Sequence, residues 1–201
     1  MKGYAEFAMR GPMQAAAAAA LPTASLFLSW LGAAVVALSV LRHGIGRSTI
    51  VIVAALLPAA FWMQAGDIGP LTTIVCVVGL ALVLRLGKSW STVLLMLPII
   101  VGAWCAAMIF ALPEYVELVR LVFEELLQRF QERLASSMSE AELQKLPALT
   151  APDGVQVVGM IAIMQSITVA FSLLVARWWQ AMLYNPGGFR EEFHALRLQR
   201  F

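Results

Sequence analysis

Charged residues are scarce in this chain. They make up 13% of its 201 residues, whereas soluble domains carry about 25%. Apolar residues make up 61% and the mean hydropathy is +0.81, more than a soluble core of this size can bury. These values predict an integral membrane protein. The net charge is only +2 and the basic residues are spread over several short segments, which excludes the continuous basic surface of a nucleic-acid-binding protein.

The side chains that most often carry catalysis or bind metals are equally rare. The chain has two histidines, His43 and His194, and two cysteines, Cys76 and Cys105. A zinc protease motif needs two closely spaced histidines and a glutamate, and neither that motif, a P-loop nor a glycine-flanked nucleophilic serine is present. Both cysteines lie inside apolar runs, where a thiol behaves as a small apolar group. We therefore expect no enzymatic activity, no cofactor and no metal site.

What the chain does contain is a series of long apolar runs, and a helix needs about 20 apolar residues to cross a bilayer. They predict an all-α, polytopic bundle of transmembrane helices. The first run is ambiguous, because residues 15–41 fit one tilted helix, whereas residues 3–21 and 26–41 fit two shorter helices that turn at residues 21–25. The bundle thus has five or six spans. The later runs are residues 49–65, 71–84, 90–112 and 155–176.

Basic residues indicate how the spans are oriented, because cytoplasmic loops are rich in Lys and Arg. The loops at residues 42–47 and 85–88 each carry two basic residues and are separated by two spans, and the basic C-terminal tail follows after two more. All three therefore fall on one side, the cytoplasm. Lys2 joins that side only if the first run forms two helices, which favours six spans over five. Both termini are then cytoplasmic, and Arg10 lies in the first span with its side chain reaching the headgroups.

One polar segment interrupts the apolar pattern. Residues 113–154 carry eight acidic and four basic residues, and their apolar residues recur at steps of three and four, which predicts an amphipathic helix. Glu125 and Arg129 have the spacing of a helical ion pair. The helix should break at residues 136–137, and Ser139 is expected to cap a second short helix. The chain is thus divided into transmembrane helices 1–5 at residues 1–112, an extracytoplasmic acidic insertion at 113–154, the last span at 155–177 and a cytoplasmic interfacial tail at 178–201.

A few polar side chains lie where the spans are expected to end on the outer side. Gln64 and Asp67 belong to the loop between two spans, and Gln165 lies in the last span. A small-molecule pocket usually has a few placed polar groups on an apolar lining. Gln64, Asp67 and Gln165 are therefore the candidate ligand-binding residues, with the alternative that Asp67 is simply a solvated loop residue.

Six consecutive alanines at residues 15–20 form a second unusual feature. Ala8, Ala16 and Ala20 are separated by multiples of four residues. Small residues at this spacing let membrane helices approach closely. The alanines predict either tight packing within the chain or docking onto another membrane protein.

The end of the last span is the most distinctive segment. Arg177 is followed by Trp178 and Trp179, and Tyr184 and Asn185 open a Tyr-Asn-Pro-Gly-Gly turn. Tryptophans near span ends favour the membrane–water interface. The segment is interpreted either as an interfacial anchor or as a docking surface for a cytoplasmic partner.

These motifs resemble those of the YybS-like family of uncharacterised bacterial membrane proteins, a domain of unknown function. The resemblance rests on the order of spans around the insertion and on Arg-Trp-Trp-Gln at 177–180, Tyr-Asn-Pro-Gly-Gly-Phe at 184–189 and Glu-Phe-Ala-Met-Arg-Gly-Pro-Met-Gln at 6–14. It implies a location in the bacterial inner membrane. That family is similar to the substrate-binding S components of energy-coupling-factor transporters. This likeness implies about six spans, a pocket near the outer face, and an alanine-rich first helix that docks onto a membrane coupling subunit driven by ATPases.

Two functions fit these features. The first is a small-molecule-binding transporter subunit that resembles an S component. The second is a non-catalytic membrane scaffold, whose acidic insertion and tail bind other envelope proteins. The last four spans contain no deeply placed ionisable group, which argues against a proton-coupled transporter or an ion pump. The lipid bilayer is an expected partner in both cases and nucleic acid in neither.

Overall fold

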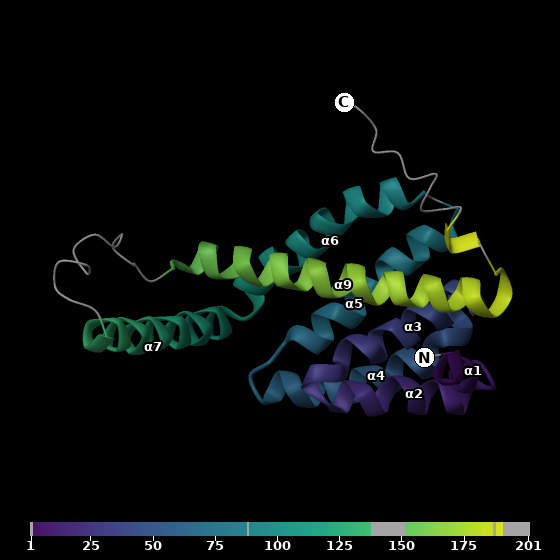
Figure 1. The fold of residues 1–201 in the computed structure, drawn as a ribbon, viewed down its shortest axis with the longest axis horizontal. Coiled ribbons are helices and arrows are strands. Elements are labelled where there is room, and N and C mark those ends of the chain that lie inside the picture. The colour runs from purple at the N-terminus through teal and green to yellow at the C-terminus, as the bar shows by residue number, and fades with distance from the viewer. Residues whose placement is uncertain (1, 88, 138–151, 187, 191–201) are drawn as a thin grey trace. The chain divides into compact units, whose positions relative to one another are not determined.

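The computed structural model describes residues 2–87, 89–137, 152–186 and 188–190, and every regular element among them is a helix (Figure 1). This confirms the all-α fold class predicted from the sequence. In chain order the elements are α1 (Lys2–Ala8), α2 (Pro12–Ala24), the 3₁₀ helix η1 (Leu26–Leu28), α3 (Ser29–His43), α4 (Ile45–Gln64), α5 (Gly69–Arg85), α6 (Trp90–Ala111), α7 (Pro113–Ser137) and α9 (Gly154–Tyr184).

Several of these helices have the length and composition of membrane spans. In the described residues, α5 is apolar but has only 17 residues. α2 has 13 residues, or about 20 Å at 1.5 Å per residue, which is less than the hydrocarbon thickness of roughly 30 Å. The four described segments long and apolar enough to cross a membrane are Leu26–His43, Ile45–Gln64, Trp90–Ala107 and Gly154–Tyr184.

The N-terminal segment is not the single helix predicted for residues 3–21. α1 ends at Ala8, and α2 begins only at Pro12. The ring of a proline fixes its own φ angle and disfavours the helical conformation in the residue before it. Gly11 is accordingly extended, with φ 178° and ψ 169°. The first predicted span is therefore replaced by two short helices.

A second break separates α2 from the next helix. α2 ends at Ala24, and Ser25 is extended, with φ −97° and ψ 119°. The alternative of one continuous helix over residues 15–41 is therefore wrong. The turn predicted at residues 21–25 lies at the observed break.

The chain divides into two compact units, and the larger one (residues 1–104 and 163–201) is organised around α3. All residues of α3 from 32 to 41 are buried, because the helix contacts α2, α4 and α5 (Figure 1). Its first turn also meets α9, where the Ser172 hydroxyl donates a hydrogen bond to the Trp30 carbonyl at 3.0 Å. The rings of Trp30 and Phe171 lie 4.9 Å apart. A helix that is apolar all round is expected to be enclosed in this way.

α2 and α3 approach each other very closely at Gly32. A Cβ atom at this position would lie 2.1 Å from Thr23 Oγ1 and 2.5 Å from the Ala19 carbonyl oxygen. The Thr23 hydroxyl is held in place, because it donates a hydrogen bond to that same carbonyl at 2.8 Å. Small residues on both helices therefore set the distance between them.

The smaller unit (residues 105–162) contains α7. This helix spans Pro113–Ser137, in agreement with the amphipathic helix predicted from the sequence. Residues 136–137, where the helix was expected to break, are still helical and are the last ones described before residue 152. Glu125 and Arg129 form the predicted ion pair, with 2.5 Å between Oε1 and Nη2. The second short helix predicted from Ser139 lies outside the described residues.

α9 is longer than predicted. The helix continues through Arg177 to Tyr184, so the boundary between last span and tail drawn at residue 177 falls inside it. No proline or glycine interrupts this stretch. The helix ends where Asn185 precedes Pro186, since the residue before a proline disfavours the helical conformation.

We expect Gly32→Ala to lower the stability of the chain by about 1–3 kcal/mol, because the added methyl group overpacks the α2–α3 contact. The matched control is Gly79→Ala in α5, where a Cβ atom would meet nothing within 4 Å. That change should be neutral or stabilising by up to about 1 kcal/mol. Thermal unfolding of both variants in detergent makes the comparison. Equal effects at the two positions would contradict a close contact at Gly32.

Candidate functional site

The arginines of the predicted cytoplasmic loops gather at one end of the larger unit. Arg85, at the end of α5, donates a hydrogen bond from Nη1 to the Leu41 carbonyl at 2.8 Å. This is the C-terminal end of α3, where the helix dipole favours a positive charge. The Arg42 guanidinium lies over the Tyr184 ring, 4.1 Å from its centroid, which is cation–π geometry. Loops predicted to share one side of the membrane therefore do meet at one end of the unit.

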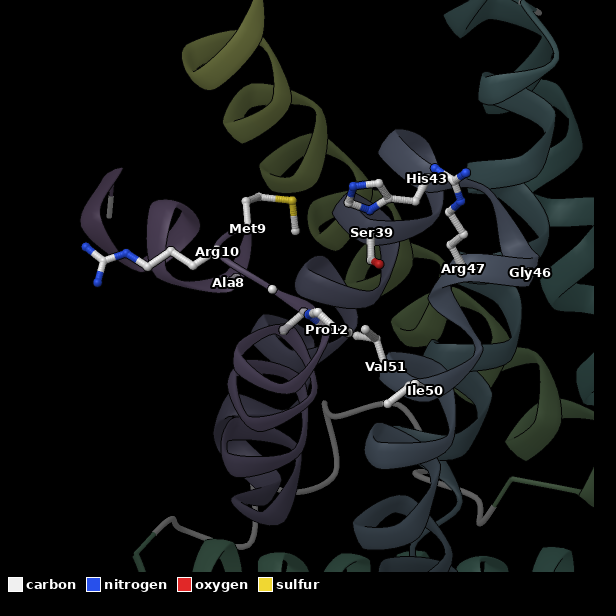
Figure 2. A pocket seen from close by; sticks show the side chains of 12 residues that line it. Ala8, Met9, Arg10, Pro12, Ser39, His43, Gly46, Arg47, Ile50 and Val51 are labelled. Carbon is white, nitrogen blue, oxygen red and sulfur yellow. The ribbon is translucent and has the colours of Figure 1, made fainter.

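A cavity of about 580 Å³ lies at this end, between the start of α2, the end of α3 and the start of α4 (Figure 2). We call it the basic cavity. Its lining includes Arg10, His43 and Arg47 and contains no carboxylate. Figure 2 shows the Arg47 guanidinium beside His43, whereas Arg10 points away from both. On the inner wall, the Ser39 hydroxyl donates a hydrogen bond to the buried Ser48 hydroxyl at 2.8 Å. The volume is typical of small-molecule pockets.

A shallower pocket of about 270 Å³ lies at the other end of α3. We call it the polar pocket. It is lined by Asp67 from the loop after α4, Thr73 from α5 and Gln165 from α9, with an apolar wall from η1 and the start of α3. Asp67 Oδ1 accepts a hydrogen bond from the Gly69 N–H at 2.7 Å. Thr73 Oγ1 lies within hydrogen-bond distance of both Gln165 Oε1 and the Gly69 carbonyl oxygen, at 2.9 Å each. Two of the three predicted ligand-binding residues are thus brought together.

The other sequence-predicted residues have different surroundings. Gln64 is exposed and does not line the polar pocket. Ala8 and Ala16 are buried within the chain, where α1 packs on α2 and α2 packs on α3 and α4. Ala20 is half-buried. Of the two alternatives predicted for the alanines, Ala8 and Ala16 therefore follow the first, tight packing within the chain.

The predicted C-terminal docking segment is divided between the interior and the surface. Trp179 is fully buried, with its ring 5.9 Å from that of Tyr4 in α1, and its Nε1 has no hydrogen-bond acceptor among the described residues. Arg177 is half-buried, and its Nη1 donates to Gln180 Oε1 at 2.5 Å. The exposed members are Trp178, Tyr184 and Asn185. Trp179 therefore anchors α9 inside the chain.

Within the described part of the chain, no group of three or more His, Cys, Asp or Glu side chains is placed to hold a metal ion. Cys76 and Cys105 are both buried, as predicted for small apolar thiols. The polar groups that line both pockets are hydrogen-bond donors and acceptors, which suits the binding of a polar molecule.

Sequence reasoning did not predict the basic cavity. The sequence places Arg10, His43 and Arg47 at the membrane surface without linking them. The predicted first span runs straight through Gly11, whereas the break there lets α1 fold back against α2. One signal was available. α2 and α4 both begin without a side-chain cap and without an acidic residue in the first turn, so their positive N-terminal ends stay uncompensated by the chain itself.

The hydrogen bond between Thr73 and Gln165 should couple α5 to α9. We expect Thr73→Val and Gln165→Leu to show a coupling energy of about 1 kcal/mol in a double-mutant cycle. Thr168→Val provides the control, since the Thr168 hydroxyl bonds to the Met164 carbonyl of its own helix. Unfolding in detergent gives the energies, and additive effects of the first pair would show that the bond does not form.

Comparison of the chain with protein-family models, with curated proteins and with solved structures finds no match. The resemblance to the YybS-like family therefore stays a prediction from the sequence. A fold by itself does not define a function, whereas the polar groups of a pocket restrict what it can bind.

Proposed function

We propose that this chain is a multi-pass inner-membrane protein that binds a small polar molecule in the polar pocket, as a transporter-associated subunit resembling an S component. The observation that carries the proposal is the convergence of Asp67, Thr73 and Gln165 from three separate elements on one pocket. A few placed polar groups on an apolar wall are the usual composition of a ligand site.

The free polar atoms of the polar pocket indicate the chemistry of its ligand. Asp67 uses Oδ1 to accept from Gly69, and Gln165 uses Oε1 to accept from Thr73. Among the described residues, Asp67 Oδ2 and Gln165 Nε2 form no hydrogen bond. A ligand with an amine or hydroxyl donor for Asp67 and an acceptor for Gln165 matches this pair. Phe27, which is 87% exposed, would cover an apolar part of the molecule.

A coupling subunit would need an accessible face on the N-terminal helices. Ala8 and Ala16 do not offer it, because they are buried. Ala17 and Leu21 are exposed on α2, four residues apart and therefore on one side of the helix. We place the docking face of this proposal on that side of α2.

Asp67→Asn is the first test of ligand binding. The variant keeps an oxygen for the Gly69 N–H but removes the charge, so we expect a co-purifying small molecule to be retained at least about tenfold less well. Native mass spectrometry of the protein released from a mild detergent measures this retention. Gln64→Ala, outside the pocket, should leave it unchanged. A bare wild-type chain, or equal retention in both variants, would count against the polar pocket.

The orientation is tested by cysteine labelling in intact cells. Ala65 and Ser89 are exposed and lie at opposite ends of the bundle, and the native cysteines are buried. We expect a membrane-impermeant maleimide to label Ala65→Cys but not Ser89→Cys, because the arginine-rich end faces the cytoplasm under the positive-inside rule. Labelling of Ser89→Cys alone would reverse the proposed orientation.

The alternative function is a membrane scaffold, and α7 is the observation that favours it. One side of this helix exposes apolar side chains, at 50% for Leu118, 57% for Leu126 and 52% for Phe130, whereas Val116 is buried. A helix with such a stripe usually covers it with a partner. Release of the chain with envelope proteins and without a small molecule, in the same mass-spectrometric experiment, is the result expected for a scaffold.

A further inference from the structure

Arg47 carries a charge that no carboxylate among the described residues of the larger unit neutralises. Those residues include two carboxylates, Glu6 and Asp67. Glu6 pairs with Lys2, with 3.7 Å between Oε1 and Nζ, and Asp67 lies in the polar pocket at the other end of α3. Arg47 forms no hydrogen bond or ion pair with a described residue. Arg47 is exposed, so an anion from outside this part of the chain can reach its guanidinium and form a charge-assisted hydrogen bond.

The backbone adds to the positive potential of the basic cavity. The cavity is lined by Gly11 and Pro12 at the start of α2 and by Gly46 and Arg47 at the start of α4. Each helix N-terminus carries about half a positive charge, and neither has a side-chain cap or an acidic residue in its first turn. The negative C-terminal end of α3 is already covered by Arg85. The two helix starts and the Arg47 guanidinium therefore all contribute positive potential to the basic cavity, and the His43 imidazole adds a hydrogen-bonding group to its lining.

One wall of the basic cavity is apolar and leads onto an exposed apolar surface. Ala15 and Val51 are buried in the wall, and Ile50 lines the cavity while 54% exposed. Ile50 begins a stripe on the outer side of α4 that continues with Val53 and Leu57, which are 50% and 69% exposed. These positions are three and four residues apart, so they share one face of the helix. An anion that also has a long apolar chain fits both halves of this surface.

We propose that the basic cavity binds one anionic phospholipid, with its phosphate at Arg47 and His43 and one acyl chain along Ile50, Val53 and Leu57. Basic pockets between transmembrane helices on the cytoplasmic side recognise anionic headgroups by the same electrostatics. The volume of about 580 Å³ admits a headgroup together with the start of a chain. The assignment rests on the proposed location in a membrane but not on the proposed ligand of the polar pocket, which lies at the opposite end of α3 and shares no lining residue with the basic cavity.

The test is competition between lipids on the full-length chain. We expect native mass spectrometry to show one retained phosphatidylglycerol, and phosphatidylcholine with the same acyl chains retained about tenfold less. Arg47→Gln should weaken retention of phosphatidylglycerol about tenfold or more, as for loss of a charge-assisted hydrogen bond. Ile50→Asn changes a half-exposed side chain and should weaken it through the acyl chain. Thermal unfolding confirms that both variants are folded.

Arg42→Gln is the matched control. It removes one charge from the same end of the unit but from a side chain that lies over Tyr184 and outside the cavity lining, so retention should stay near that of the wild type. If Arg42→Gln and Arg47→Gln lowered the retention of phosphatidylglycerol equally, the effect would come from the net charge of this end of the unit, and the proposed site would be overturned. Equal retention of the two lipids would do the same. Displacement of the lipid by soluble glycerol 3-phosphate at matched concentration would overturn the lipid assignment in favour of a free phosphate ester.

Discussion

The close approach of α2 and α3 at Gly32 is the contact on which the rest of the larger unit depends. Lipid tails are as apolar as leucine, so helices in a bilayer associate through close packing and hydrogen bonds more than through burial of apolar surface. Gly32 lets α2 lie against α3, and the Trp62 Nε1 then donates to the Thr23 carbonyl at 3.1 Å, which ties α4 to the pair. α3 is enclosed as a result, and its two ends become the places where the neighbouring helices leave room for pockets.

Much of the fold follows from the apolar runs and from the polar loops that separate them. The helices near residues 49–65, 71–84 and 90–112 begin and end within a few residues of where the sequence predicts, because loops with Gly, Asp or basic residues separate them. The hydropathy pattern does not predict the break between α1 and α2, since it averages over Gly11 and Pro12, whereas helix geometry depends on each residue. The length of α9 was missed because Arg177 ends the apolar run without ending the helix.

The sequence also predicts the residues of the two pockets only in part. Asp67 and Gln165 were predicted together because both are polar residues at the expected outer level of their spans, and helix order is enough to bring them close. Gln64 has the same chemistry but points elsewhere, and no sequence pattern distinguishes it from Asp67. The basic cavity depends on how α1 folds back, with the Tyr4 hydroxyl donating to the Ala18 carbonyl. The hydrogen bond holds α1 against α2 across the turn between them, and the spacing of apolar residues in the sequence does not predict this turn.

The shortness of α2 has a mechanical consequence for the membrane around it. α2 has 13 residues and α4 has 20, which correspond to about 20 and 30 Å of helix. Met13 and Leu21 are more than 70% exposed on α2, so lipid that meets this helix has to thin or tilt to match it, at a cost of fractions of a kcal/mol per Å. Two chains that bring their α2 helices together share one thinned region instead of making two. A thinner bilayer therefore lowers the cost of this mismatch.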